Sequence, residues 1–335
     1  MIDQKNMLLL ANHLKANHYQ FTTTTPASHA IVMQRSYDEN TVSMRDIFGW
    51  NRPFRSSALD NTSLAYMRAA NVLSEYTETN NHQQDSIDYT GLPKNTGLLK
   101  STVRFSSLAI HATEHLFLHS AFPTTAADAV FFGPDSYRFA TLLKKTIANL
   151  PNKDYKIIVD IGTGSGVGGI VAASYLQNRY QQLILSDINQ QALEYAEINA
   201  ALASIKHVSV VQSDLYAAFK HPIDLIIANP PYLVDTTARA YRHGGGEYGS
   251  LLSTRIVLEG LPLLAEGGAF ILYTASPIVD GVDIFKTSIK PALNDANFSY
   301  VYEEIDPDVF GEELLTQAYK DVDRIAVVAL VIVKK

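Results

Sequence analysis

The pattern of apolar positions changes near residue 135. Up to about residue 76, Leu and other apolar residues recur mostly at three- and four-residue spacing, which predicts helices. Beyond residue 135, short apolar runs alternate with segments of helical periodicity. Strands are predicted at residues 156–161, 183–187, 207–212, 223–228, 269–274, 298–305 and 324–333. Helices are predicted at residues 167–178, 189–201, 250–264 and 280–296, with Asn189 as an N-cap and Gly267-Gly268 ending the third of them.

This alternation indicates an α/β fold, with a mostly parallel, doubly wound sheet and helices on both faces. The last two predicted strands are separated by residues 307–319, which contain no clear crossover helix. A parallel pair needs such a crossover, so we expect these two strands to pair antiparallel. The N-terminal part is expected to be a smaller, mainly helical domain.

Two features separate the helical part from the α/β part. Residues 77–97 are rich in Thr, Asn, Gln, Asp and Gly and predict a polar linker. Residues 103–108 and 115–122 predict two short strands of a hairpin. The predicted organisation is a helical domain with its linker at residues 1–97, a hairpin-like connector at residues 98–132 and an α/β domain at residues 133–335.

Composition and charge limit the function classes. The chain has no cysteine, which excludes disulfides, thiolate zinc sites and cysteine nucleophiles and fits a cytoplasmic protein. The N-terminus lacks the pattern of a signal peptide, and the late apolar run at residues 325–333 is far shorter than the roughly 20 residues of a membrane helix. The net charge of −7 favours a substrate other than long nucleic acid, although distant residues can still assemble a local basic patch.

A glycine-rich turn joins the first strand of the α/β domain to its helix. Gly162, Gly164 and Gly166 allow a sharp turn and let a ligand lie against bare backbone at a helix N-terminus. Gly164 and Gly166 together with Gly169 also satisfy the dinucleotide spacing G-x-G-x-x-G, and a turn without any ligand is a further alternative. Asp160 precedes the glycines. Its carboxylate would repel a pyrophosphate but could accept hydrogen bonds from a cationic amino acid, directly or through water.

Two further acidic residues follow the next predicted strands. Asp187 lies about twenty residues beyond the glycines, where a carboxylate can accept from both hydroxyls of an adenosine ribose. Asp214 follows the third strand and is placed to accept from an adenine amino group. Each has a structural alternative, because aspartate also caps helices. These positions support nucleoside binding without choosing the nucleoside.

The segment Asn229-Pro230-Pro231-Tyr232 is the most specific motif of the chain. It follows the predicted strand at residues 223–228, at the carboxyl edge where open α/β sheets bind ligands. Two consecutive prolines fix the backbone and push each preceding residue to extended geometry. The Asn229 side chain and the Pro230 carbonyl can then accept from one NH2 group, and Tyr232 offers a flat face to a planar substrate. A purely structural turn is the alternative.

With these motifs the chain resembles class I S-adenosylmethionine-dependent methyltransferases of the NPPY group, in particular the HemK/PrmC glutamine methyltransferases of peptide release factors. The resemblance extends from about residue 130 to the C-terminus. It includes residues 132–137 (FGPDSY), where the family has a motif before the cofactor domain, and the glycine-rich residues 243–249 (HGGGEYG) after NPPY. Two features depart from the family. Leu272-Tyr273-Thr274 lacks the acidic character expected at the end of the fifth strand, and the N-terminal domain is longer.

The resemblance implies the class I methyltransferase fold, S-adenosylmethionine as the cofactor, and methyl transfer to a planar amide or amine nitrogen. It assigns catalysis to Asn229, Pro230 and Tyr232. It assigns cofactor binding to Asp160, Gly162, Gly164, Gly166, Asp187, Asp214 and Asn229.

The substrate is less tightly specified than the cofactor. A protein glutamine, such as that of a release factor, is favoured, with an adenine or guanine amine in RNA or DNA as the alternative and a small molecule as a third choice. A non-catalytic nucleotide-binding module or a dehydrogenase is a different class, for which NPPY would have no purpose. The sequence does not indicate the oligomeric state.

One rival motif lies in the predicted hairpin. Residues 111–115 (HATEH) fit the zinc-peptidase spacing H-x-x-E-H, with His119 four residues further on. Such a site needs a helix to bring His111 and His115 to one face, whereas the neighbouring residues predict strands. No distal Glu ligand is identifiable, so we predict no metal site.

Overall fold

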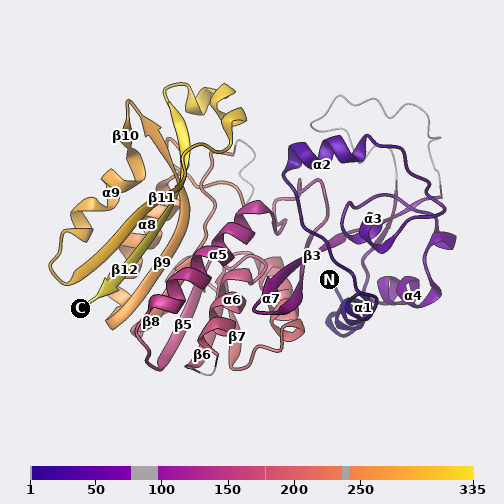
Figure 1. Cartoon of the computed structure of the whole chain (residues 1–335), viewed down its shortest axis with the longest axis horizontal. Coiled ribbons are helices and arrows are strands. Elements are labelled where there is room, and N and C mark those ends of the chain that lie inside the picture. The colour runs from indigo at the N-terminus through magenta and orange to yellow at the C-terminus, as the bar shows by residue number, and fades with distance from the viewer. Residues whose placement is uncertain (1, 77–96, 178, 236–240) are drawn as a thin grey trace. The chain divides into compact units, whose positions relative to one another are not determined.

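The computed structural model describes residues 2–76, 97–177, 179–235 and 241–335, which fold as two compact units (Figure 1). The first unit comprises Met1–Thr124 and Phe132–Pro134, and the second comprises Thr125–Phe131 and Asp135–Lys335.

Helices and short two-stranded sheets make up the first unit. Its helices are α1 (Gln4–Ala16), α2 (Pro26–Met33), α3 (Met44–Phe48) and α4 (Asn61–Ala69), with a short 3₁₀ helix η1 (Ser56–Ala58). β1 (Leu73–Glu75) pairs antiparallel with β2 (Leu99–Ser101), and β3 (Val103–Ile110) pairs antiparallel with β4 (Thr113–Ser120). The helical pattern and the hairpin are therefore confirmed. The predicted polar linker lies, except for Gly97, outside the described residues.

The β3–β4 hairpin is hydrogen-bonded to N-terminal segments of the first unit. The backbone N–H of Ser107 donates to the Phe21 carbonyl oxygen over 2.8 Å. Arg104 Nε donates to the Gly49 carbonyl oxygen over 2.7 Å. The hydrogen bonds of the hairpin reach segments that precede it by 55 residues or more, and the connector at residues 98–132 stays a prediction. Local sequence patterns carry no information about partners at that separation.

The second unit is built around one large sheet with the strand order β11-β12-β9-β8-β5-β6-β7. Its strands are β5 (Tyr155–Ile161), β6 (Tyr180–Asp187), β7 (Val208–Gln212), β8 (Ile223–Ala228), β9 (Leu264–Val279), β11 (Phe298–Asp306) and β12 (Arg324–Lys334), with the short β10 (Val282–Asp283) beside β9. β5 to β9 pair parallel, and β12 pairs antiparallel with both β9 and β11. The predicted doubly wound sheet with an antiparallel last strand is confirmed.

The helices of the second unit follow the prediction with three differences. They are α5 (Pro134–Asn149), α6 (Val167–Leu176), α7 (Gln190–Leu202), α8 (Leu251–Gly260) and α9 (Ile284–Leu293), with short 3₁₀ helices η3 (Leu261–Leu263), η4 (Gly311–Leu315) and η5 (Gln317–Tyr319). Asn189 is the N-cap of α7, as predicted, and its side chain accepts from the Gln191 N–H. The sequence analysis did not predict α5. α9 begins later than predicted, because β10 precedes it.

The third predicted helix ends within one residue of its predicted bound, but Gly267-Gly268 do not end it. It ends before Leu264, which is extended and begins β9, and Gly267 and Gly268 lie inside that strand. Pro262 lies in η3, where α8 changes to a 3₁₀ helix, because proline has no backbone N–H to continue the α-helical hydrogen bonds. Pairing of Leu264 with Ile223 of β8 then fixes the chain as strand.

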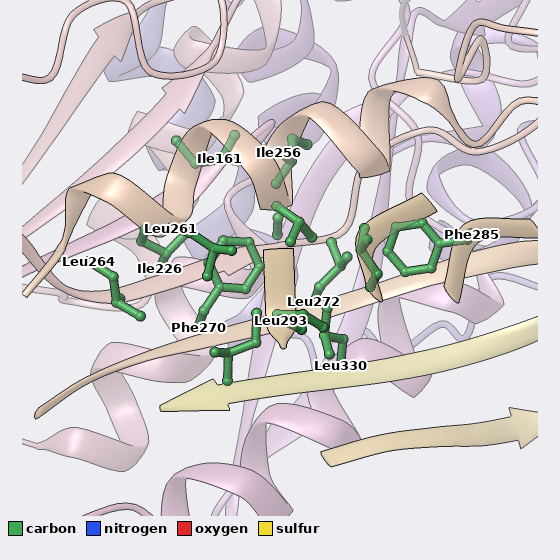
Figure 2. Close-up of a cluster of buried hydrophobic side chains, with 14 of the residues drawn as sticks. Ile161, Ile226, Ile256, Leu261, Leu264, Phe270, Leu272, Phe285, Leu293 and Leu330 are labelled. Atoms are coloured by element: carbon green, nitrogen blue, oxygen red, sulfur yellow. The ribbon is translucent and has the colours of Figure 1, made fainter. Parts of the chain in front are cut away.

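Both faces of the sheet are buried and mostly apolar, but only one of them also carries Asp160 and Tyr273. Alternate strand residues point to opposite faces, and one face packs on α8 and α9 as a hydrophobic core. Figure 2 shows Ile161, Ile226, Phe270, Leu272 and Leu330 gathered with Ile256, Phe285 and Leu293. The intervening positions face α5 and α6, where Asp160 accepts from Gly169 N and Tyr273 donates to Asp135. The polar residues of the site therefore lie on the face of the sheet opposite to the apolar core.

No helix within the described parts of the chain combines the length and the apolar composition that crossing a membrane requires.

Candidate active site

The register of the sheet brings the predicted motifs together at its carboxyl edge. Ile161 of β5 pairs with Ala228 of β8, so the glycine turn and the NPPY segment leave the sheet side by side. Asp187 ends β6, the other neighbour of β5. Tyr273 directly follows the pairing of Ala228 with Leu272. Segments far apart in the sequence thus form one row, in the place where open α/β sheets bind ligands.

The glycine turn has an open side and a packed side. Gly162 and Gly164 have φ of +66° and +55°, and a Cβ added at either would have no described atom within 4 Å. Gly166 has φ of +80°, and a Cβ there would lie 3.1 Å from Ala196 Cβ of α7. Gly162 and Gly164 therefore present bare backbone to a ligand, which fits the close approach of a nucleoside cofactor. Gly166 serves the packing of the turn, and the role in cofactor binding assigned to all three stays a prediction.

Asp160 is buried and forms hydrogen bonds within the glycine turn and to the helix that follows it. It is 1% exposed, and its Oδ2 accepts from Thr163 Oγ1 over 2.6 Å and from Gly169 N over 2.8 Å. These bonds tie the turn to α6. Burial raises the pKa of Asp160 from its ordinary value to about 7, against the effect of both hydrogen bonds. The predicted contact of Asp160 with the cofactor, direct or through water, stays a prediction.

We expect Asp160 to make the protein less stable as the pH rises from about 4 to about 7. In this window the folded state keeps a proton that the unfolded state loses, because the pKa is 3.8 for a free Asp and about 7 here. Stability therefore falls with rising pH. Urea unfolding of the wild type and of Asp160→Asn across this range measures the effect. The wild type should lose stability relative to the variant as the pH rises.

The control for this experiment is Asp154→Asn, which removes an exposed carboxylate shortly before β5. It should follow the wild type at every pH. Parallel pH curves for wild type and Asp160→Asn would contradict the assignment.

Asp187 connects the turn to α7. Its Oδ2 accepts from Gly164 N and its Oδ1 from Asn189 N, both over 2.9 Å. Burial raises its pKa. A carboxylate has about four acceptor positions, so both oxygens can still accept from ribose hydroxyls. The alternative that Asp187 caps a helix is only partly correct. Asn189 is the N-cap of α7, and Asp187 accepts a hydrogen bond from the Asn189 N–H.

Asp214 differs from the other two acids because its side chain is 61% exposed. Arg255 Nη2 lies 4.0 Å from its Oδ1. The residues after it form a turn and no helix, and Ser213 Oγ accepts from Ala218 N in that turn. The alternative that Asp214 caps a helix is therefore wrong. Its contact with an adenine amino group stays a prediction.

The NPPY segment begins directly after β8 ends at Ala228. Pro230 is buried and Asn229 is half-buried. Among the residues that the structure describes, the Asn229 side chain makes no hydrogen bond. An amide that directly follows a strand next to an open backbone turn is suited to receive a ligand group, because its hydrogen-bonding capacity is not used within the fold.

The glycine-rich residues 243–249 pack against the backbone of this segment. Leu233 and His243 form an isolated bridge, and Gly244 N donates to Leu233 O over 2.7 Å. A Cβ at Gly249, which has φ of +83°, would lie 2.5 Å from the Tyr232 carbonyl oxygen. A side chain there would displace the NPPY backbone, so glycine is required for the close approach.

Tyr232 is held at its hydroxyl. Its Oη donates to Asp135 Oδ2 over 2.6 Å, and the side chain is buried. Asp135 Oδ1 also accepts from Tyr273 Oη over 2.8 Å. The sequence analysis assigned no role to Asp135 or Tyr273. The only signal was the resemblance of residues 132–137 to a family motif. Stacking of Tyr232 on a planar substrate stays a prediction.

The zinc-peptidase spacing at residues 111–115 does not form a site. His111 lies in the tight turn between β3 and β4, and His115 lies on β4. They do not share a helix face. Within the described part of the chain, no group of three or more possible ligands is close enough to hold a metal ion.

Comparison with known proteins agrees with this geometry. Residues 135–275 match the family described as methyltransferase small domain. A release factor glutamine methyltransferase of Borreliella burgdorferi is 35% identical over 99 residues, which are 29% of this chain and 34% of that protein. The enzyme of the same name from Deinococcus radiodurans is 30% identical over 142 residues, 39% of this chain and 50% of that protein. The ribosomal RNA small subunit methyltransferase C of Vibrio cholerae is 30% identical over 128 residues, 38% of this chain and 33% of that protein.

The sheet order and the antiparallel β12 give the second unit the fold of class I S-adenosylmethionine-dependent methyltransferases, and residues 135–275 match a methyltransferase family. Within that class it is similar to the HemK/PrmC glutamine methyltransferases. The alternative of a dehydrogenase is not supported. The chain spans between a third and a half of the length of the curated relatives it was compared with above.

Proposed function

We propose that this protein transfers a methyl group from S-adenosylmethionine to the side-chain nitrogen of a protein glutamine. The observation that carries the proposal is the Asn229 amide, which makes no hydrogen bond within the described residues and follows β8 directly beside the open glycine turn. An amide in this position can bind the flat NH2 group of a substrate amide while the turn binds the cofactor.

The residues of the NPPY segment would position the nitrogen. Asn229 Oδ1 and the Pro230 carbonyl oxygen accept the two N–H groups of the glutamine amide, and this directs the nitrogen toward the turn. S-adenosylmethionine would supply a methyl group made electrophilic by its positively charged sulfur; the nitrogen would form the new C–N bond and release one proton to water as the C–S bond breaks and S-adenosylhomocysteine leaves. Holding the reactants in line supplies most of the rate in such a reaction, and strong acid or base chemistry is not needed.

Two observations support a protein substrate. The chain has a net charge of −7, whereas proteins that grip nucleic acid usually present a basic surface. Two relatives are named release factor glutamine methyltransferases, and on that basis we propose a release factor as the partner. We place the reaction in the cytoplasm because the chain contains no cysteine. The alternative substrate is a nucleobase amine, and the Vibrio cholerae relative that acts on ribosomal RNA supports it.

Labelling separates the two substrates. The purified protein is incubated with methyl-labelled S-adenosylmethionine and a lysate that lacks the endogenous enzyme. We expect the label in protease-digestible material, with a rate that changes little between about 50 and 200 mM salt. An enzyme that neutralises several phosphates loses affinity steeply over this range. Label recovered in nuclease-digestible material, with a steep salt dependence, would decide for the nucleobase.

A further inference from the structure

Three hydrogen bonds converge on the carboxylate of Asp135 in the first turn of α5. Tyr232 Oη donates to Oδ2 over 2.6 Å, Tyr273 Oη donates to Oδ1 over 2.8 Å, and Arg138 Nη1 donates to Oδ1 over 3.0 Å. The Asp135 side chain is 13% exposed and Tyr273 is fully buried. Hydrogen bonds to a carboxylate are about twice as strong as neutral ones, and burial strengthens them further.

The Tyr232 hydroxyl donates its only hydrogen to this carboxylate. Burial, reinforced by the nearby charge of Asp135, raises the pKa of Tyr232 well above its ordinary value of 10. The hydroxyl therefore stays protonated and remains a donor at any physiological pH. A substrate can meet only the ring of Tyr232, and the hydroxyl serves to fix where that ring lies.

The two tyrosines come from neighbouring parts of the sheet, because Tyr232 follows β8 and Tyr273 lies within β9. Ala228 of β8 pairs with Leu272 of β9, so Asn229 and Tyr273 are adjacent along the carboxyl edge. Asp135 bonds to Tyr273 and also to Tyr232 at the far end of the NPPY segment. The segment is thus anchored at its start by β8 and at its end by a carboxylate from α5.

We infer that Asp135 is a positioning residue of the methyl-transfer site: by holding Tyr232 it sets the angle at which the NPPY segment presents Asn229 to the substrate amide, and Tyr273 keeps the carboxylate in place. The inference rests on the proposed function. It also bears on Leu272-Tyr273-Thr274, where an acidic residue was expected from the family. There Tyr273, within β9, binds a carboxylate from α5.

The test compares Asp135→Ala, Tyr232→Phe and their double variant. We expect each single change to lower kcat about tenfold or more, while the affinity for S-adenosylmethionine stays within about twofold. The double variant should be no worse than Asp135→Ala, because both single changes remove the same hydrogen bond. Tyr273→Phe removes one hydroxyl from the other side of the carboxylate and should lower kcat by a smaller factor, about threefold.

The matched control is Asp306→Ala. Asp306 Oδ2 lies 3.4 Å from Arg138 Nη2, so this change removes a carboxylate from the same arginine and leaves both tyrosine bonds intact. It should retain the wild-type kcat. Because Tyr232→Phe and Tyr273→Phe keep both rings, the inference can be tested even if Asp135→Ala does not fold.

A second measurement needs no substrate. Amide hydrogen exchange of Asn229 and of residues 232–235 should become faster in Asp135→Ala and Tyr232→Phe by more than any fall in melting temperature accounts for. Faster exchange in a protein that methylates no glutamine would support the inference and reject only the proposed function. Unchanged exchange together with additive losses of kcat in the double variant would overturn the inference.

Discussion

Replacing Asn229 by alanine is expected to abolish methyl transfer while leaving cofactor affinity nearly unchanged. Its amide makes no hydrogen bond within the described residues, and its position beside the glycine turn follows from the pairing of Ala228 with Ile161. Removing a preorganised polar group of this kind costs on the order of 100-fold or more in rate. Single-turnover rates with the labelled substrate measure the loss, and calorimetry with S-adenosylmethionine measures the binding.

The control is Asn152→Ala. Asn152 is exposed before the start of β5, at the opposite edge of the sheet, where its Oδ1 accepts from Arg179 Nη1 over 2.8 Å. This variant should turn over normally. If Asn229→Ala keeps a near-normal rate on the true substrate, the NPPY segment is only a structural turn.

The second large effect is expected at Asp187. Asp187→Ala removes the predicted acceptor for the ribose hydroxyls and also the two backbone bonds that fix Gly164 and Asn189. Hydrogen bonds to a charged group contribute about 1.5–3 kcal/mol, which corresponds to a loss of about tenfold or more in affinity. Calorimetry should show weakened binding of S-adenosylmethionine. NAD should produce no binding heat with either protein, and tight NAD binding without S-adenosylmethionine binding would overturn the cofactor assignment.

Asp224 offers a matched control for this variant. Its Oδ2 accepts from the backbone N–H groups of Lys156 and Ile157 over 3.1 and 3.0 Å, at the amino edge of the same sheet. Asp224→Ala therefore removes a comparable pair of backbone bonds far from the turn. It should lower stability without changing cofactor affinity. Equal losses of affinity in both variants would mean that Asp187 acts only through the stability of the sheet.

Sequence reasoning was most successful where the signal is local. The strand at residues 223–228 and the N-cap Asn189 were predicted at the positions where they occur. The hydrophobic period and the capping preference depend on neighbouring residues only. The glycine turn and the NPPY segment are local in the same sense, because glycine and proline restrict the backbone wherever they stand. Gly267-Gly268 show the limit of that reasoning, because the helix ended near its predicted bound but the two glycines lie inside β9.

The sequence by itself determined most elements of the second unit, the antiparallel last strand and the motifs at the carboxyl edge of the sheet, but not α5. Only the tertiary structure decided which hydrogen bonds the side chains of those motifs make. Asp160 is buried and accepts a hydrogen bond from Gly169 N, because the alternation of side chains along the strand directs it toward α6. The contact of Asp135 with Tyr232 spans 97 residues, and that with Tyr273 spans 138. Such contacts depend on how the sheet and helices pack, and no periodicity or motif in a single sequence encodes that packing.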